Sequence, residues 1–176
     1  WFKKFIQDHN ISTVYDPCGG WGHRFIGAMS CNIKYIYNDI WLSSCKGIQD
    51  IANLIKCNNY KIYNNDCTQS SIDDKYECVF TCPPYYNTEI YNSGCFSNLE
   101  SYNIFIQRLI INSIKPCVNI IGIVINNKYE YIINQNIPNS FIQVDRIILG
   151  STHAVSHFNK SQSTKQEILL IYNRKD

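Results

Sequence analysis

The chain has 176 residues, 45% of them hydrophobic, and a formal net charge of +2 at pH 7. This length and composition exclude a disordered chain and predict a single domain over residues 1–176. The small net charge gives only weak support for a nucleic-acid partner, and the longest apolar run, residues 118–125, is too short and interrupted to span a membrane.

The cysteines predict reduced thiols. The chain has nine of them, an odd number, and no Cys-x-x-Cys pair. This pattern argues against both a disulfide framework and a zinc site, so we expect no bound metal. Reduced cysteines and the lack of a secretory signal predict an intracellular protein, in the cytoplasm or nucleus.

The first predicted strand ends in a glycine-rich loop. Residues 1–9 carry apolar side chains at helical spacing, and residues 11–15 form an apolar run typical of a strand. The loop at residues 16–22 begins with Asp-Pro and contains three glycines, and residues 21–31 have helical character. Strand, glycine turn and helix predict the first half of a βαβ unit with a ligand at the strand end. The loop lacks the Gly-Lys-Ser/Thr ending of a phosphate loop, so we expect no nucleoside triphosphate.

The next two predicted strands end in acidic residues. Residues 34–39 end in Asp39, residues 60–66 end in Asp66, and a helix is expected between them at residues 43–56. An acid after the second strand of a nucleoside-binding unit accepts hydrogen bonds from ribose hydroxyls. Asp39 is therefore a candidate ribose ligand or a cap of the following helix, or both. Asp66 is a candidate ligand or a turn residue.

The fourth predicted strand ends in a rigid turn. Residues 76–81 read as a buried strand, and residues 82–85 read Cys-Pro-Pro-Tyr. Proline fixes φ and has no N–H for a sheet ladder, so the strand must stop there. The pattern predicts a stiff turn with an aromatic side chain at the same edge of the sheet as the glycine loop.

The second half of the chain completes the predicted sheet. Helices are expected at residues 99–114 and 128–134, and strands at residues 118–125, 141–149 and 167–172. Residues 87–97 lack periodicity and predict a mobile loop over the site. The polar, acid-free loop at residues 150–166 joins the last two strands without a helix, which predicts an antiparallel pair at the sheet edge.

The glycine loop, Asp16-Pro-Cys-Gly-Gly-Trp-Gly22, and the turn Cys82-Pro-Pro-Tyr85 together resemble the motifs of S-adenosylmethionine-dependent methyltransferases, in particular the DNA amino-methyltransferases that modify adenine N6 or cytosine N4. The order of elements is similar along nearly the whole chain. The resemblance implies an α/β, Rossmann-like class I methyltransferase fold: a seven-stranded, mostly parallel sheet with an antiparallel edge hairpin and helices on both faces. It implies S-adenosyl-L-methionine as the cofactor and nucleic acid as the partner, with DNA favoured over RNA.

The resemblance also implies roles for individual residues. The implied cofactor-binding residues are Asp16, Pro17, Cys18, Gly19, Gly20, Trp21, Gly22, Arg24, Asp39, Ile40, Asp66 and Cys67. The implied catalytic residues are Cys82, Pro83, Pro84 and Tyr85, and the implied substrate-binding residues are Tyr85, Tyr86, His153, His157 and Lys160. The Pro83 carbonyl would accept a hydrogen bond from the target amine, and Tyr85 would stack on the base. Arg24 would either pair with the methionine carboxylate or face solvent.

Cys82 departs from the family pattern, which has Asp, Asn or Ser at this position. An exocyclic amine is a poor nucleophile until acceptors bind its hydrogens, and a thiol is a weak acceptor. This departure leaves open a catalytically silent methyltransferase-like binding module. Because related Pro-Pro turns also serve RNA amines and protein amides, an RNA methyltransferase and a protein-amide N-methyltransferase stay open as well. No separate target-recognition domain is evident, so target recognition is assigned to the loops at residues 87–97 and 150–166, to a partner subunit, or to sequence before Trp1 if this chain is a fragment of a longer one.

Overall fold

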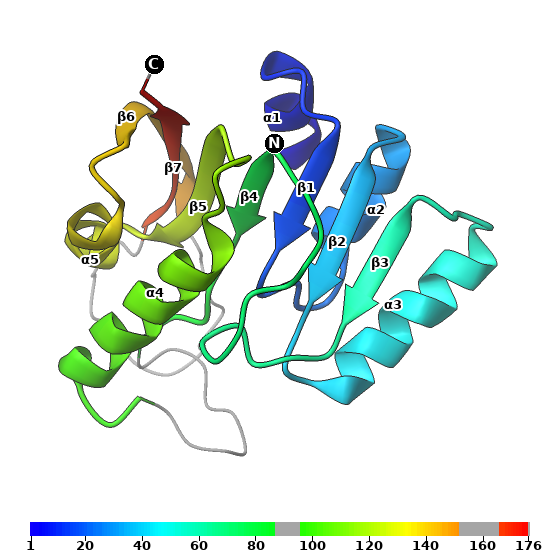
Figure 1. Ribbon diagram of the computed structural model, residues 1–176, viewed down its shortest axis with the longest axis horizontal. Helices are drawn as coiled ribbons and strands as arrows, with labels where there is room; N and C mark the ends of the chain where they lie inside the picture. The colour runs from blue at the N-terminus through cyan, green and yellow to red at the C-terminus, as the bar shows by residue number, and fades with distance from the viewer. Residues whose placement is uncertain (87–95, 152–165, 176) are drawn as a thin grey trace.

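A computed structural model of the chain describes residues 1–86, 96–151 and 166–175. Its centre is a seven-stranded sheet in the order β3-β2-β1-β4-β5-β7-β6 (Figure 1). The strands are β1 Thr13–Asp16, β2 Lys34–Asn38, β3 Tyr60–Tyr63, β4 Cys78–Thr81, β5 Ile120–Asn126, β6 Phe141–Ser151 and β7 Gln166–Arg174. The helices are α1 Phe2–Asp8, α2 His23–Ser30, α3 Leu42–Leu54, α4 Leu99–Ser113 and α5 Glu130–Asn136, with a 3-10 turn η1 at Asn127–Tyr129.

Strands β1 to β5 run parallel to one another, and β7 is antiparallel to both of its neighbours, β5 and β6. The predicted seven-stranded, mostly parallel sheet with an antiparallel edge pair is therefore confirmed. All residues of β5 are buried, as expected for a central strand covered on both faces.

Each face of the sheet has its own apolar core. Helices α1, α2 and α3 pack on one face, where Phe2 and Ile48 belong to the same cluster as Phe80 of β4. Helices α4 and α5 pack on the other face, where Ile106 and Ile132 belong to the other cluster. Helices on both faces leave the ends of the strands as the accessible edges, and this is where a ligand can bind. None of the helices in the described ranges is long and apolar enough to cross a membrane.

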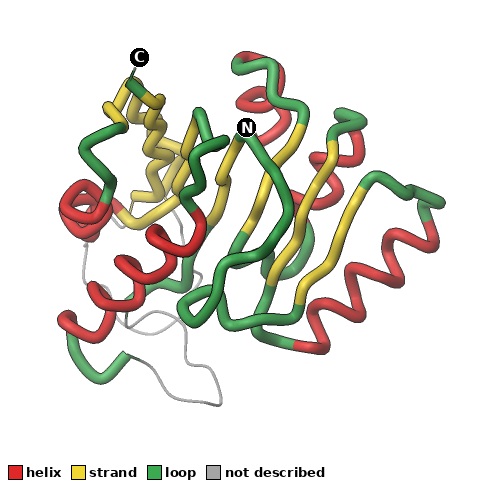
Figure 2. Tube along the Cα trace, viewed as in Figure 1, coloured by secondary structure: helices red, strands yellow, loops and turns green. Residues whose placement is uncertain are grey.

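The connection from β3 to β4 is a loop without a helix. Figure 2 shows it crossing the sheet between the end of β3 and the start of β4. Its apolar side chains Cys67, Ile72 and Tyr76 are buried in the core on the α4 side. These side chains fill the space that a crossover helix would otherwise cover.

Several predicted boundaries differ from the structure. The predicted strand at residues 60–66 ends at Tyr63, so Asp66 lies in the loop, and Asp39 lies just beyond β2. The Asp66 carboxylate accepts hydrogen bonds from the Thr68 N–H and hydroxyl, which turns the chain out of the strand direction. Both acids still follow the carboxyl ends of their strands.

Candidate functional site

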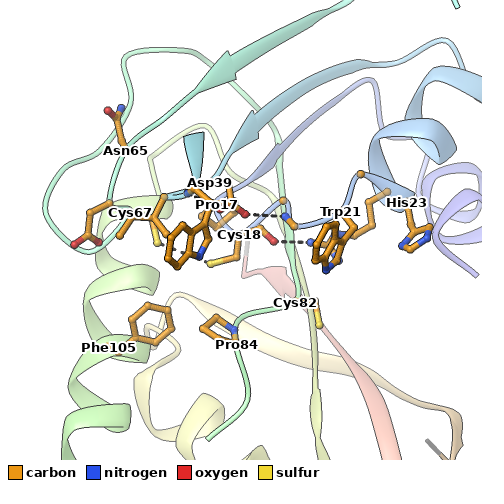
Figure 3. A pocket seen from close by; sticks show the side chains of 17 residues that line it. Pro17, Cys18, Trp21, His23, Asp39, Asn65, Cys67, Cys82, Pro84 and Phe105 are labelled. Atoms are coloured by element: carbon orange, nitrogen blue, oxygen red, sulfur yellow. Dashed lines mark hydrogen bonds between the residues drawn. The ribbon is translucent and has the colours of Figure 1, made fainter. Parts of the chain in front are cut away.

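A cavity of about 260 Å³ opens at the carboxyl ends of β1, β2, β3 and β4. Four loops and the helices α2 and α4 contribute its walls, and Figure 3 shows their side chains converging on it. The lining residues are Pro17, Cys18, Gly19, Gly20, Trp21, Gly22, His23, Arg24, Asp39, Ile40, Trp41, Asn65, Asp66, Cys67, Cys82, Pro84 and Phe105. The glycine loop and the Pro-Pro turn, far apart in sequence, therefore share one hollow.

The glycine loop is held by close packing. A Cβ on Gly19 would lie 2.1 Å from Cε2 of Tyr37, and Gly22 has a φ of +85°. The Tyr37 hydroxyl donates a hydrogen bond of 2.7 Å to the Gly20 carbonyl. The loop therefore keeps its backbone, rather than side chains, against this part of the cavity.

Asp16 lies beneath the loop and does not line the cavity. Its buried carboxylate accepts a hydrogen bond of 2.6 Å from Arg24 Nε and another from the Tyr35 hydroxyl. Arg24 Nη2 also donates to the Cys18 carbonyl at 2.6 Å. Asp16 therefore shapes the loop from below, which differs from the expected direct contact with a ligand.

Arg24 does not face solvent, so that alternative was wrong. Its side chain is 14% exposed, because the ion pair with Asp16 draws it under the glycine loop. Burial alone would lower the pKa of Arg24, but the Asp16 carboxylate outweighs burial and raises that pKa above its usual value. The guanidinium is thus a permanent positive charge in the cavity wall.

Asp39 joins the loops that follow β1 and β2. Its Oδ2 accepts a hydrogen bond from the Gly20 N–H and its Oδ1 accepts one from the Trp41 N–H, both at 2.9 Å. Burial raises the pKa of Asp39, and these two N–H groups partly oppose the rise. Trp41, not Asp39, occupies the N-cap position of α3, so the expected capping role is limited to supporting the Trp41 N–H. Each carboxylate oxygen keeps a further lone pair for a ligand.

The loop after β3 is fixed to the same assembly. The buried Asn38 side chain donates to the carbonyls of Pro17 and Asn65, each at 3.0 Å. Asp66 forms the turn described above and also lines the cavity, so both of its expected roles are compatible with its position. Cys67 also lines the cavity, with its sulfur 3.9 Å from that of Cys18.

The Pro-Pro turn brings Cys82 and Pro84 to the cavity. The Cys82 thiol donates to the Tyr85 hydroxyl at 3.5 Å, and burial raises the pKa of Cys82, which keeps it protonated. Pro83 and Tyr85 are absent from the cavity lining among the described residues. The Tyr85 hydroxyl donates instead to Glu167 Oε1 of β7 at 2.6 Å, so the ring is tethered beside the cavity.

The remaining predicted substrate residues fall into two groups. The Tyr86 ring packs against Tyr102 and Tyr129, with ring centroids 5.8 Å apart in both pairs, and does not line the cavity. The predicted contacts His153, His157 and Lys160, and nearly all of the loop predicted at residues 87–97, lie outside the described residues.

The residues of the site that sequence reasoning missed include Asn65, Phe105 and Glu167. Asn65 immediately precedes Asp66, a predicted ligand, so its place in the sequence could have indicated that it belongs to the site. Phe105 comes from α4 and Glu167 from β7, and no local pattern links either residue to the glycine loop. In the described part of the chain, no group of three or more His, Cys, Asp or Glu side chains is arranged to hold a metal ion.

The sequence matches no protein-family model and no curated protein. Solved structures share the fold. TrmN from Thermus thermophilus superposes with a TM-score of 0.70 at 9% identity over 99% of this chain, which spans about half (48%) of that protein. Magnesium protoporphyrin IX methyltransferase (ChlM) from Synechocystis PCC 6803, solved with bound SAM, has a TM-score of 0.63 at 14% identity over 99% of this chain and 76% of its own.

Ribosomal protein L11 methylase from Lactobacillus delbrueckii subsp. bulgaricus has a TM-score of 0.63 at 16% identity, over 99% of this chain and 77% of its own. At such low identities, these similarities establish the fold of the chain. The predicted Rossmann-like architecture, a mostly parallel seven-stranded sheet with an antiparallel edge pair, is confirmed.

Proposed function

We propose that the chain is an S-adenosyl-L-methionine-dependent methyltransferase that modifies an exocyclic amine of a nucleic-acid base. The observation that carries this proposal is the shared cavity. One hollow is lined by the glycine loop, by Asp39 and by the Cys82 end of the Pro-Pro turn. The part of the cavity proposed to bind the nucleoside therefore adjoins the part proposed to hold the amine, as transfer of a methyl group between two bound molecules requires.

The cavity residues fit the cofactor. Asp39 would accept hydrogen bonds from the ribose hydroxyls, since both carboxylate oxygens keep free lone pairs. Ile40 and Trp41 would contact the adenine ring, and the Arg24 guanidinium in the wall would attract the methionine carboxylate. When bound, the cofactor supplies an electrophilic methyl group on a sulfonium. The neighbour with bound SAM shows that this fold can hold the molecule.

The Pro-Pro turn would prepare the amine. The delocalised lone pair of an exocyclic amine becomes available when acceptors bind the amine hydrogens, and two prolines fix such acceptors before the substrate arrives. The Pro83 carbonyl and the Cys82 sulfur are the proposed acceptors, and attack requires about 3–3.5 Å between the reacting atoms. Tyr85, whose ring is tethered beside the cavity, is the proposed stacking surface for the target base, and stacking of this kind would contribute roughly 1–3 kcal/mol.

DNA is the preferred substrate in this proposal because the Pro-Pro turn resembles that of the DNA amino-methyltransferases. An RNA amine and a protein amide are the alternatives within the same chemistry. A silent binding module is the alternative of a different class, and the thiol of Cys82 is the observation that favours it, because a neutral thiol is a weak acceptor. We further propose one catalytic domain with target recognition supplied by its loops or by a partner subunit.

Calorimetric titration with S-adenosylhomocysteine tests the cofactor half. We expect Asp39→Asn to weaken binding by about 10- to 100-fold, because hydrogen bonds to a charged group contribute about 1.5–3 kcal/mol. Asp50→Asn, an exposed position on α3, is the matched control and should bind as the parent does. Equal affinity in the parent and Asp39→Asn, or no binding by the parent, would contradict the proposed cofactor site.

Transfer of tritiated methyl groups tests the substrate half. Single-stranded DNA, duplex DNA, RNA and an unmodified protein extract are offered in parallel, and we expect label in DNA. Label in RNA or protein alone would identify the corresponding alternative. A parent without activity that gains it through Cys82→Asp or Cys82→Ser would identify a silent module.

A further inference from the structure

The Pro-Pro turn is connected to the far part of the sheet by a chain of two hydrogen bonds. The Cys82 thiol donates to the Tyr85 hydroxyl at 3.5 Å, and that hydroxyl donates to Glu167 Oε1 at 2.6 Å. Glu167 is 82 residues from Tyr85 and belongs to β7, which is separated from β4 by β5 (Figure 1). No motif at the turn itself indicates this connection.

The antiparallel direction of β7 explains why Glu167 reaches the site. Glu167 is paired in register with Asn126, the last residue of β5. The beginning of β7 therefore lies at the carboxyl edge of the parallel strands, where the cavity opens. A parallel strand in this place would present its other end to the site.

The donors and acceptors fix the direction of the chain. An ionised carboxylate only accepts, so the single hydroxyl proton of Tyr85 is committed to Glu167. The Tyr85 oxygen then has only lone pairs to offer Cys82, and the single thiol proton must point toward Tyr85. Cys82 is also one of the residues that line the cavity, and with its proton on the Tyr85 side its sulfur has only lone pairs left for another partner.

We propose that Glu167 is a positioning residue of this site: acting through the Tyr85 hydroxyl, it holds the Cys82 proton on the Tyr85 side and leaves the sulfur to accept a hydrogen bond from the bound amine. The amine rests on the proposed function, whereas the orientation of the thiol is a property of the protein without substrate. Hydrogen-bonded chains polarise their members, so the carboxylate also makes the sulfur a better acceptor than an isolated thiol. Cys82 thus has a physical role at a position where the DNA amino-methyltransferases have Asp, Asn or Ser, which are stronger hydrogen-bond acceptors.

Infrared difference spectroscopy of the S–H stretching band tests the inference without any substrate. Subtracting the spectrum of Cys82→Ala from that of the parent isolates the Cys82 band among those of the other thiols. We expect this band at a lower wavenumber than that of a free thiol. Tyr85→Phe, which removes the acceptor and keeps the ring, should shift the band to the free-thiol position. Glu167→Gln, which replaces the carboxylate with a weaker neutral acceptor, should shift it part of the way.

Tyr131→Phe and Glu130→Gln, neighbouring positions on α5 that do not line the cavity, are the matched controls and should leave the band in place. A Cys82 band that is unmoved by either site variant would overturn the inference. So would a band that responds to Glu167→Gln but not to Tyr85→Phe, because Glu167 would then not act through Tyr85. S-adenosylhomocysteine titration of the same samples keeps the two proposals separate: failure of binding with the expected band shifts would contradict the proposed function and leave the orientation of the thiol established.

Discussion

At the scale of single residues, two positions of the glycine loop, Gly19 and Gly22, leave no room for a side chain. A Cβ on Gly22 would lie 2.3 Å from Cδ1 of Ile48, a buried side chain of α3, and the φ of +85° already disfavours any other residue. Gly47, on the same helix as Ile48, has nothing within 4 Å of its added Cβ. The backbone at Gly22 therefore requires glycine, whereas Gly47 could carry a side chain without strain.

We expect Gly22→Ala to lower the free energy of unfolding by about 1–3 kcal/mol, through the left-handed backbone penalty and the displacement of Ile48. It should also weaken S-adenosylhomocysteine binding, because the loop backbone lines the cavity. Gly47→Ala should raise the unfolding free energy by about 0.5–1 kcal/mol, since alanine favours a helix interior. Urea denaturation measures both variants, and equal effects from the two would contradict the conformational argument.

The sequence also shows its limits at this scale. The glycine loop after the first strand and the acids after the next two strands could be predicted from the sequence, because these residue types have conformational or chemical preferences of their own. The ion pair of Asp16 with Arg24 was not predicted, although both residues had been singled out, because the direction of a side chain depends on what surrounds it. The tether of Tyr85 to Glu167 was out of reach for the same reason.

At the scale of elements, the loop from β3 to β4 takes the place of a crossover helix. Its anchor is Asp74, whose carboxylate accepts hydrogen bonds from Lys61 at 2.8 Å, Tyr63 at 2.5 Å and Lys34 at 3.3 Å. Burial alone would raise the pKa of Asp74, but these donors outweigh burial and lower it to about 2. One carboxylate thus ties the crossing loop to both β2 and β3.

Asp74→Asn should therefore lower the free energy of unfolding by about 1–2 kcal/mol at pH 7. The size follows from the lowered pKa of Asp74, and it is reduced because the two lysines are partly exposed and solvent screens their charges. A lowered pKa in the folded state stabilises the protein above the ordinary aspartate pKa of 3.8, and that contribution is lost as the pH falls toward about 2. The difference between parent and variant should shrink over this interval.

Chemical denaturation at a series of pH values measures that difference. Asp8→Asn is the matched control, because Asp8 also pairs with a lysine but its side chain is 50% exposed, and the expected cost is under about 1 kcal/mol. A cost for Asp74→Asn that is independent of pH between 4 and 2 would show that the carboxylate charge does not hold the loop.

At the scale of the whole molecule, the periodicity of apolar residues predicted the type and order of the elements and an α/β fold. The seven-stranded, mostly parallel sheet was implied by the resemblance of the two motifs to those of methyltransferases. No particular residue predicted that β7 would lie between β5 and β6. This position places Glu167 at the carboxyl edge, where Asn126 of β5 is its partner in the ladder. The fold is thus more predictable than the site, because a site combines side chains from elements whose neighbours only the sheet order decides.

A ligand in the cavity would contact loops from four strands, so its binding should stabilise the whole domain. At a concentration 100 times its Kd, S-adenosylhomocysteine should raise the free energy of unfolding by about 2.7 kcal/mol, which corresponds to roughly 5–10 °C in Tm for a domain of this size. Asp39→Asn should lose about half of that shift or more at the same concentration, because its Kd is expected to be about 10 to 100 times higher. ATP should cause none, because the glycine loop lacks the Lys-Ser/Thr pair of a phosphate loop, and the Arg24 guanidinium in the cavity wall is outnumbered by the carboxylates of Asp39 and Asp66. Thermal denaturation with each ligand measures these shifts, and an equal shift with ATP would show that the cavity selects a nucleoside without regard to its phosphate or methionine portion.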